Sequence, residues 1–319
     1  MIVMLIVGVI VVAIVGFDML DNLRPSNPVS SITPSPTSTP TISPIFEILQ
    51  DLYDFTSGDE CKNNDNWLSS SSWCIWYGVR CATNTETIIR IFMDRNNLQG
   101  SIPSSIGFLS TLESLSLSDS LTGKIPTEIG LLSNLERLSL SDGSLSGTIP
   151  SEIILLSSLQ SIYVEFNSLT GTIPTTIGLL SSLDLLYLGF NALTSTVPSE
   201  IGMLSNLTVL SLAGNNLIST IPSELGLLSN LELLFLLQNS LSGTIPTEVG
   251  MLSNVRTLNF YNNDLSGNIP SEIGVLSSLR SVHLKDNSNM NGTIPFEVCE
   301  LINAGLSVST SGTNIENTC

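Results

Sequence analysis

A unit of about 24 residues recurs along most of this 319-residue chain and constrains its fold more than any other feature. Each unit contains an Ile-Pro or Val-Pro step, and successive steps lie 23, then six times 24, and finally 25 residues apart. A unit this short cannot bury an apolar face alone, so it must stack on its neighbours. We therefore expect nine stacked units at residues 88–297 rather than the two globular domains that the length alone would suggest.

The unit at residues 183–206, LDLLYLGFNALTSTVPSEIGMLSN, indicates what each position does. Leu186 and Leu188 alternate with Tyr187, and this period of two predicts a short strand with the leucines inside and the tyrosine outside. Asn191 follows where the chain turns, and its side chain carries both a donor and an acceptor. Stacked asparagines can therefore satisfy the backbone groups of their own and adjacent turns.

The asparagine column is interrupted in two successive units, where Ser120 and Gly143 take its place. The 23-residue interval falls at the same point, because Leu121 comes one residue early. We predict a locally weaker stretch there. The column otherwise consists of Asn96, Asn167, Asn191, Asn215, Asn239, Asn263 and Asn287.

A proline and an acidic residue mark the turn of most units. Proline fixes φ and donates no hydrogen bond, so it suits the end of a strand or the start of a turn. An acidic side chain in the first turn of a short helical segment interacts favourably with the helix dipole. The acidic column predicts charge on the convex turns, with a row of ion ligands as the alternative. Its members are Glu128, Glu152, Glu200, Glu224, Glu248, Glu272 and Glu297.

The chain begins with an uncharged apolar run from Met1 to Phe17. The run approaches the length of a transmembrane helix, about 20 residues, and slightly exceeds a signal-peptide core of about 7–15. We expect residues 1–20 to be an uncleaved signal-anchor with the rest of the chain outside, and a cleaved signal peptide is the alternative. Residues 21–44, rich in Pro, Ser and Thr, predict a disordered stalk or a plain linker.

A cysteine-rich motif precedes the repeats within residues 45–87. Ser43 and Pro44 suit the N-cap and first position of a helix, and a helical stripe of apolar residues follows them. The motif reads C-x-W-x-G-V-x-C and comprises Cys74, Trp76, Gly78, Val79 and Cys81.

This motif and the L-[ST]-G-x-I-P units resemble plant-type leucine-rich repeat proteins over roughly residues 45–319. That family includes receptor-like proteins, receptor-kinase ectodomains and polygalacturonase-inhibiting proteins. The resemblance implies an α/β repeat solenoid, a horseshoe with a parallel β-sheet on its concave face and short helical turns on its convex side.

The resemblance also implies a disulfide between Cys74 and Cys81 in the N-terminal cap. We expect Cys299 and Cys319 to pair across the C-terminal cap at residues 298–319, where Leu306 and Val308 can supply a final strand. Cys61 is left over; it can be free, pair within the cap or bridge two chains. Cysteines at both ends of a repeat array indicate an oxidising compartment.

Composition disfavours catalysis and nucleic-acid binding. The formal net charge is -18, and binding phosphates requires a Lys/Arg surface. A single His, His283, occupies an outward strand position, and no nucleotide-binding, dinucleotide-binding or zinc spacing occurs. We expect a protein that is not an enzyme, with no cofactor and no metal. We expect no kinase domain in this protein, so that signalling would need a co-receptor.

The outward strand positions vary between units and therefore carry specificity. Aromatic residues gather at these positions in the middle units, and aromatics commonly anchor protein interfaces or stack on sugars. We expect them to bind a protein or peptide, with a glycan as a further partner; the alternative is that the rings merely cover neighbouring strands. The predicted binding residues are Tyr163, Phe166, Tyr187, Phe190, Phe235, Leu237 and Tyr261.

Two other functions fit the same sequence. The family resemblance admits an inhibitor of a polysaccharide-degrading enzyme. A threonine column before Ile-Pro or Val-Pro admits a structural or ice-binding surface. Asn206 and Asn291 begin N-glycosylation sequons, consistent with a protein at the cell membrane, secreted or in a cell wall. The threonine column is Thr148, Thr172, Thr196, Thr220, Thr244 and Thr293.

Overall fold

The structure is a computed structural model that describes residues 43–319. The predicted anchor or signal peptide at residues 1–20, and the stalk up to residue 42, lie outside the described residues. Within residues 43–319, no helix combines the length and apolarity that crossing a membrane requires.

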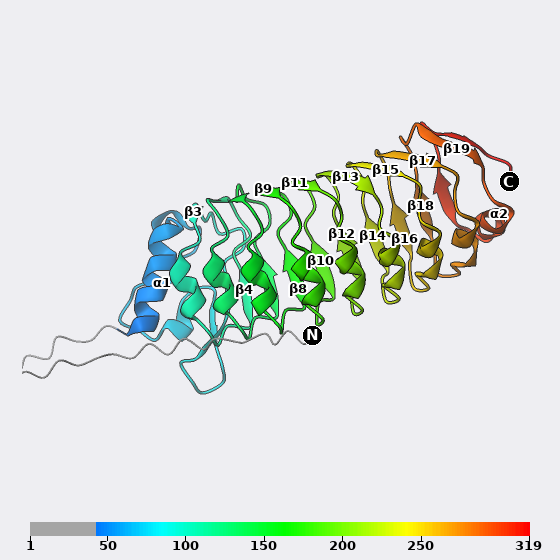
Figure 1. Ribbon diagram of the computed structural model, residues 1–319. Coiled ribbons are helices and arrows are strands. Elements are labelled where there is room, and N and C mark those ends of the chain that lie inside the picture. Colours follow the sequence, from blue (N-terminus) through cyan, green and yellow to red (C-terminus); the bar gives the residue numbers. More distant parts are fainter. Residues whose placement is uncertain (1–42) are drawn as a thin grey trace, which may run out of the picture. The chain divides into compact units, whose positions relative to one another are not determined.

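An 11-stranded sheet runs through the whole repeat array (Figure 1). Each unit contributes one strand; in β4 to β18 the middle residue is a buried Leu, Ile or Val, and neighbouring units pair in parallel and in register. Only the first pair, β1 with β2, is antiparallel. The order is β1 (Val79–Cys81), β2 (Ile88–Phe92), β4 (Ser114–Ser116), β6 (Arg137–Ser139), β8 (Ser161–Tyr163), β10 (Leu185–Tyr187), β12 (Val209–Ser211), β14 (Leu233–Phe235), β16 (Thr257–Asn259), β18 (Ser281–His283) and β20 (Ser307–Ser309).

A second parallel sheet, which we did not predict, lies along the upper edge of the array in Figure 1. Its strands follow the asparagine turn, and in several units they include the Leu and Ser or Thr of the L-[ST]-G segment. The strands are β7 (Ser146–Gly147), β9 (Ser168–Gly171), β11 (Ala192–Ser195), β13 (Asn216–Thr220), β15 (Ser240–Gly243), β17 (Asp264–Gly267), β19 (Asn289–Thr293) and β21 (Asn314–Glu316).

A short 3-10 helix follows the second-sheet segment in most units, which confirms the predicted helical turns. Each begins directly after the repeat proline, whose fixed φ sets the entry to the turn, and most carry glutamate in the first turn. The glutamates therefore lie on the turns opposite the 11-stranded sheet. These helices are η3 (Ser104–Phe108), η4 (Thr127–Leu131), η5 (Ser151–Leu155), η6 (Thr175–Leu179), η7 (Ser199–Met203), η8 (Ser223–Leu227), η9 (Thr247–Met251) and η10 (Ser271–Val275).

The asparagine column forms a buried ladder of hydrogen bonds. Asn215 accepts a bond at Oδ1 from the backbone N–H of Leu193 in the preceding unit, at 3.0 Å. Its Nδ2 donates to the carbonyl oxygens of Leu188, at 3.1 Å, and of Leu212, at 3.1 Å. Each asparagine thus links two units and satisfies backbone groups that would otherwise be buried without partners.

The hydrogen bonds of the ladder have different partners at the two units that lack the asparagine. Asp119 replaces the missing asparagine, because its Oδ2 accepts the Leu98 N–H at 3.0 Å. The Leu121 N–H instead bonds to the Asp119 carbonyl oxygen two residues away, at 2.7 Å. The second sheet also stops here: β3 (Gly100–Ser101) and β5 (Leu121–Thr122) form a separate pair, joined to β7 by one isolated bridge from Lys124 to Ser146.

We predict that backbone amides at residues 119–124 exchange with solvent about tenfold faster than those at 191–196. The first segment lacks the inter-unit asparagine bond to Leu121, whereas the equivalent Leu193 has one. Hydrogen-exchange mass spectrometry on the folded protein measures the ratio. Equal exchange in the two segments would contradict the predicted local weakness.

The N-terminal cap covers the first edge of the core. Helix α1 (Pro44–Phe55) has Ser43 at its N-cap, as predicted, and it precedes η1 (Gly58–Glu60) and η2 (Trp73–Ile75). The fully buried Trp76 packs against the rings of Phe46 and Trp67, with centroids 5.7 and 5.3 Å apart.

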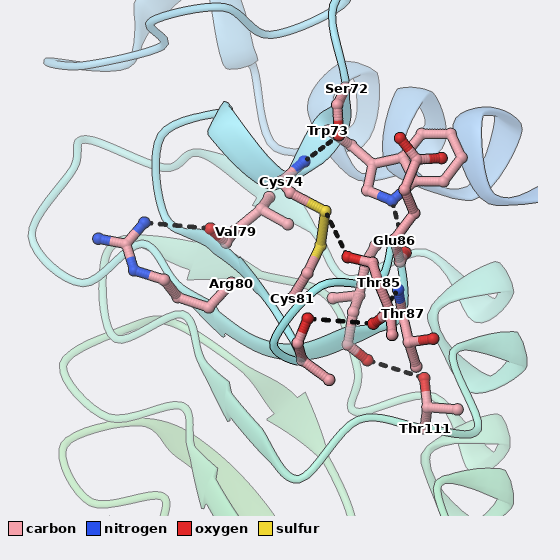
Figure 2. Close-up of a disulfide and its surroundings, with 12 residues drawn as sticks. Ser72, Trp73, Cys74, Val79, Arg80, Cys81, Thr85, Glu86, Thr87 and Thr111 are labelled. Carbon is pink, nitrogen blue, oxygen red and sulfur yellow. Dashed lines mark hydrogen bonds between the residues drawn. A yellow bond between two sulfur atoms is a disulfide. The ribbon is translucent and has the colours of Figure 1, made fainter.

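A disulfide between Cys74 and Cys81 ties η2 to β1 at the end of the sheet (Figure 2). The indole N–H of Trp73 donates to the Glu86 carbonyl oxygen at 2.8 Å, which fastens the loop that follows β1. Together these links fasten the segments before and after β1, which is the edge strand of the sheet.

The C-terminal cap has the predicted final strand and disulfide. Helix α2 (Phe296–Asn303) replaces the 3-10 turn of the last unit, and Val308 in β20 pairs with Val282 in β18. Cys299 in α2 is bonded to Cys319. Cys61 forms no disulfide within residues 43–319 and is partly buried, so pairing within the cap is not found, and a bridge between two chains stays a prediction.

Candidate ligand-binding face

The outward side of the 11-stranded sheet, here called the sheet face, carries the seven predicted binding residues. In each three-residue strand from β4 to β18 the first and third residues point outward, and a further outward residue follows two positions later. Tyr163 and Tyr187 occupy equivalent positions and are paired in register across β8 and β10. Phe235 has the same position in β14, and Ser211 of β12 lies between Tyr187 and Phe235.

Four of the seven form two stacked pairs. The rings of Tyr163 and Tyr187 lie 5.0 Å apart with planes 17° from parallel, and those of Phe166 and Phe190 lie 4.6 Å apart at 4°. The Arg137 guanidinium lies 5.8 Å from the Tyr163 ring centroid, so it covers one end of the tyrosine stack. Stacking across strands holds each ring in one orientation.

The two phenylalanines adopt a backbone conformation that bulky residues rarely accept. Phe166 has φ 54° and Phe190 has φ 51°, both left-handed. Other units place smaller or polar residues at this position, including Gly214 at 61° and Asp142 at 63°. The turn therefore imposes the conformation, which is unfavourable for phenylalanine. The two rings nevertheless remain exposed, Phe166 at 49% and Phe190 at 38%.

The other three predicted residues form a second group. Phe235 and Leu237 lie on and just after β14, and Tyr261 follows β16. The Lys285 ammonium lies 5.7 Å from the Tyr261 ring centroid. Ser211 and Ala213, both small and buried, separate this group from the stacked pairs. The predicted residues thus share one face, but they form two groups rather than one strip.

A second outward column, not among the predicted residues, runs across the strands of both groups. It begins each strand, two residues before the column that contains Tyr187, and it is apolar in three successive strands. The alternation that placed Tyr187 outside also places these residues outside, so the signal was present. They are Leu185, Val209 and Leu233.

Glu165 is a charged side chain among these rings that the sequence analysis did not select. It extends across Gly189, and its Oε1 accepts a hydrogen bond from the Ser211 hydroxyl at 3.0 Å, two strands away. A Cβ at position 189 would lie 2.9 Å from that oxygen, so the absence of a side chain at Gly189 makes room for the carboxylate. No Lys or Arg of residues 43–319 forms an ion pair with it.

Burial raises the pKa of the Glu165 carboxyl above its ordinary value of 4.5, and the Asp142 carboxylate raises it further. The Ser211 hydroxyl and the Gly189 backbone lower it but do not reverse the shift. The folded protein therefore holds this proton at pH values where the unfolded chain has released it. The stability that the proton confers is present below about pH 4.5 and is lost as the pH rises through the folded pKa.

We predict that Glu165→Gln raises the thermal midpoint relative to wild type at pH 7 and leaves it unchanged at pH 4. Glutamine keeps the shape and removes the charge whose burial is unfavourable. Asp94→Asn is the control, because Asp94 is exposed and accepts bonds from the Ser116 hydroxyl and the Ser118 N–H. If the difference in thermal midpoint between wild type and Glu165→Gln is the same at pH 7 and at pH 4, the raised pKa of Glu165 is contradicted.

His283, Asn206 and Asn291, the other residues singled out from the sequence, lie apart from one another. His283 is half-buried in β18, opposite Asn259 of β16, and residues 43–319 hold no cluster of potential metal ligands. Asn206 and Asn291 are exposed, so glycosylation at both stays a prediction. The most exposed apolar side chains of the repeats, such as Leu179 at 58% and Val275 at 70%, stand at the last residue of successive 3-10 turns, so they form a row on the side opposite the 11-stranded sheet.

The second sheet presents regular rows of hydroxyl groups. Thr172, Thr196 and Thr220 are exposed at equivalent positions of adjacent units, and the repeat places further threonines on both sides of them. They line an open hollow of about 620 Å³ beside the prolines that start the 3-10 turns. Successive hydroxyls follow the strand spacing of about 4.8 Å.

Comparison with known proteins agrees with this architecture. Family models described as leucine rich repeat match residues 157–217, 134–156 and 254–276. The ectodomain of the Arabidopsis thaliana membrane receptor kinase GASSHO1/SCHENGEN3, solved with CASPARIAN STRIP INTEGRITY FACTOR 2, superposes with a TM-score of 0.80 at 35% identity, covering 86% of this chain and 33% of that one. The chain is a plant-type leucine-rich repeat protein.

Other solved leucine-rich repeat structures are similar as well. The plant peptide hormone receptor RGFR1 in complex with RGF2 is 40% identical, with a TM-score of 0.70 over 76% of this chain and 37% of that one. The chain spans about a third of the length of these two receptors. A plant ice-binding protein is 28% identical, with a TM-score of 0.62 over 78% of this chain and 88% of that one. No curated protein matched the chain in a sequence comparison.

Proposed function

We propose that this leucine-rich repeat protein is a non-catalytic extracellular recognition module, receptor-like without a kinase, that binds a peptide or protein through the sheet face. The observation that carries the proposal is the pair of phenylalanines, Phe166 and Phe190, held in a left-handed conformation while their stacked rings remain exposed. A side chain chosen only for stability would avoid that backbone cost. A ligand that contacts the two rings explains why phenylalanine occupies these positions.

The chemistry of the face fits a peptide. Rigid aromatic rings give contact area at little cost in side-chain entropy, and such residues dominate protein interfaces. The receptors GASSHO1/SCHENGEN3 and RGFR1, which share this fold, were solved with bound ligands, and this supports the same use of the repeat here. We propose that signalling, if the protein signals, passes through a co-receptor, and that residues 1–20 anchor the chain to the membrane or direct its secretion.

A capture experiment tests the proposal. The immobilised wild-type chain and a Tyr187→Ala/Phe235→Ala variant are exposed to an extracellular extract, and retained peptides and proteins are identified by mass spectrometry. We expect a partner that wild type retains and the variant loses. A Thr196→Ala/Thr220→Ala variant of the second sheet is the matched control and should retain it. Equal capture by wild type and the Tyr187/Phe235 variant would remove the sheet face as the site.

A second candidate is ice binding by the second sheet. It is favoured by the exposed threonine rows and by the structural similarity to a plant ice-binding protein. Regularly spaced hydroxyls on a parallel sheet can order water in a repeating pattern. The test is growth of single ice crystals in the presence of the protein. Faceted crystals with wild type and round ones with Thr196→Ala/Thr220→Ala would establish this function, and round crystals with both would exclude it.

A further inference from the structure

We call the part of the sheet face between the two groups of rings the recess, because its residues are smaller than those beside them; it carries the Glu165 carboxylate. On β12 the outward residues after Val209 are small, namely Ser211 and Ala213, whereas the flanking strands carry Tyr187 on one side and Phe235 on the other. Glu165 brings its carboxylate to Ser211 by crossing Gly189. Tyr187, paired with Ser211 across β10 and β12, therefore lies beside the carboxylate, and Phe190 follows Gly189 directly in sequence.

The Glu165 carboxylate has no positively charged partner within the described residues. The carboxylate is half-buried and receives one side-chain hydrogen bond, from Ser211, at Oε1. No cation of residues 43–319 pairs with it; the Asp142 carboxylate acts on it directly, and Asp184 acts on the neighbouring Tyr187. The ionised carboxylate is therefore open to a cation that a ligand brings, and pairing would offset the cost of burying its charge.

The surrounding rings select among cations. A guanidinium is planar, stacks on aromatic faces, is weakly hydrated and can present two N–H groups to one carboxylate. An ammonium keeps more of its hydration and does not stack. The formal net charge of -18 also attracts cationic ligands over a distance.

We propose that this recess binds an arginine side chain of the peptide ligand, with Glu165 pairing to the guanidinium and Tyr187, Phe190 and Phe235 flanking it. The inference rests on the proposed function and adds the chemical identity of one ligand residue. Ser211 and Gly189 act as positioning residues, because the first orients the carboxylate and the second leaves it room.

The test measures binding of two short probes to the full chain by NMR titration. The probes are acetyl-Phe-Arg-amide and acetyl-Phe-citrulline-amide, which differ only in the charge of the last side chain. We expect the arginine probe to bind wild type about tenfold more tightly, as a charge-assisted hydrogen bond requires. Glu165→Gln should remove that preference.

Two further variants separate pairing from general effects of charge or folding. Gly189→Ala retains the carboxylate but places a Cβ 2.9 Å from its Oε1 and 3.1 Å from the Ser211 Oγ, so it should also reduce the preference. Asp94→Asn removes an equal charge from an equivalent sheet-face position without stacked rings, and it should leave the preference unchanged. A thermal melt confirms that each variant is folded.

Equal binding of the two probes to wild type, including no binding of either, would overturn the arginine assignment. So would an unchanged preference in Glu165→Gln. The proposed function is judged separately, by capture with the Tyr187→Ala/Phe235→Ala variant. A partner that is lost by that variant but retained by Glu165→Gln would keep the recognition face and reject the arginine recess.

Discussion

Replacement of Leu212 by alanine is expected to lower the free energy of unfolding by about 2–5 kcal/mol. The Leu212 side chain is fully buried, and it follows the central strand β12 in the middle of the array. Its carbonyl oxygen also accepts the Asn215 Nδ2, so its backbone is fixed and cannot move to fill the cavity. Because stability in a repeat array is a sum over neighbour interfaces, one cavity at the centre weakens two of them.

Chemical denaturation followed by circular dichroism measures this change. Ile218→Ala is the matched control, because Ile218 is 52% exposed on β13 only six residues away in the sequence. It should alter the free energy by no more than about 0.5 kcal/mol. Equal destabilisation by the two variants would show that Leu212 is not a core residue of this fold.

Loss of the rings at Tyr187 and Phe235 is expected to weaken ligand binding by about 100-fold or more. Buried aromatic anchors at the centre of an interface each contribute about 2 kcal/mol or more, and about 1.4 kcal/mol corresponds to tenfold in affinity. Tyr187 is half-buried and stacked on Tyr163, so its position is set before the ligand arrives.

Isothermal titration with the captured ligand gives the two dissociation constants. Single variants show whether the rings act independently, since Tyr187 and Phe235 lie two strands apart and belong to different groups. The stability of Tyr187→Ala/Phe235→Ala should remain close to that of wild type, because neither side chain is fully buried. A change of less than about threefold in affinity would place the binding energy on another surface.

Periodicity predicted most of the fold because each repeat position has one physical role. The Leu columns, the asparagine ladder, the proline turns, the cap helix that starts at Pro44 and the final strand through Val308 all follow from local pattern. The second sheet did not, because its strands are too short to show a period of two. Asp119, which substitutes for a missing asparagine, was also missed, because it stands one residue earlier than the column.

The candidate site was only partly predictable. Sequence spacing placed the seven residues on one face, but the division into two groups depends on how small Ser211 and Ala213 are relative to their neighbours. The contact from Glu165 to Ser211 spans 46 residues, so no local pattern reveals it. Contacts of this kind arise from the packing of adjacent units rather than from the repeat consensus.

Site-specific photo-crosslinking tests the sheet face most directly. A benzophenone amino acid is placed in turn at Phe190 on the sheet face, at Ile218 on the second sheet and at Leu179 on a 3-10 turn, all of which are exposed. After irradiation with the captured ligand, we expect a covalent complex from position 190 and none from positions 179 and 218. Crosslinking from 179 or 218 without crosslinking from 190 would contradict recognition through the sheet face.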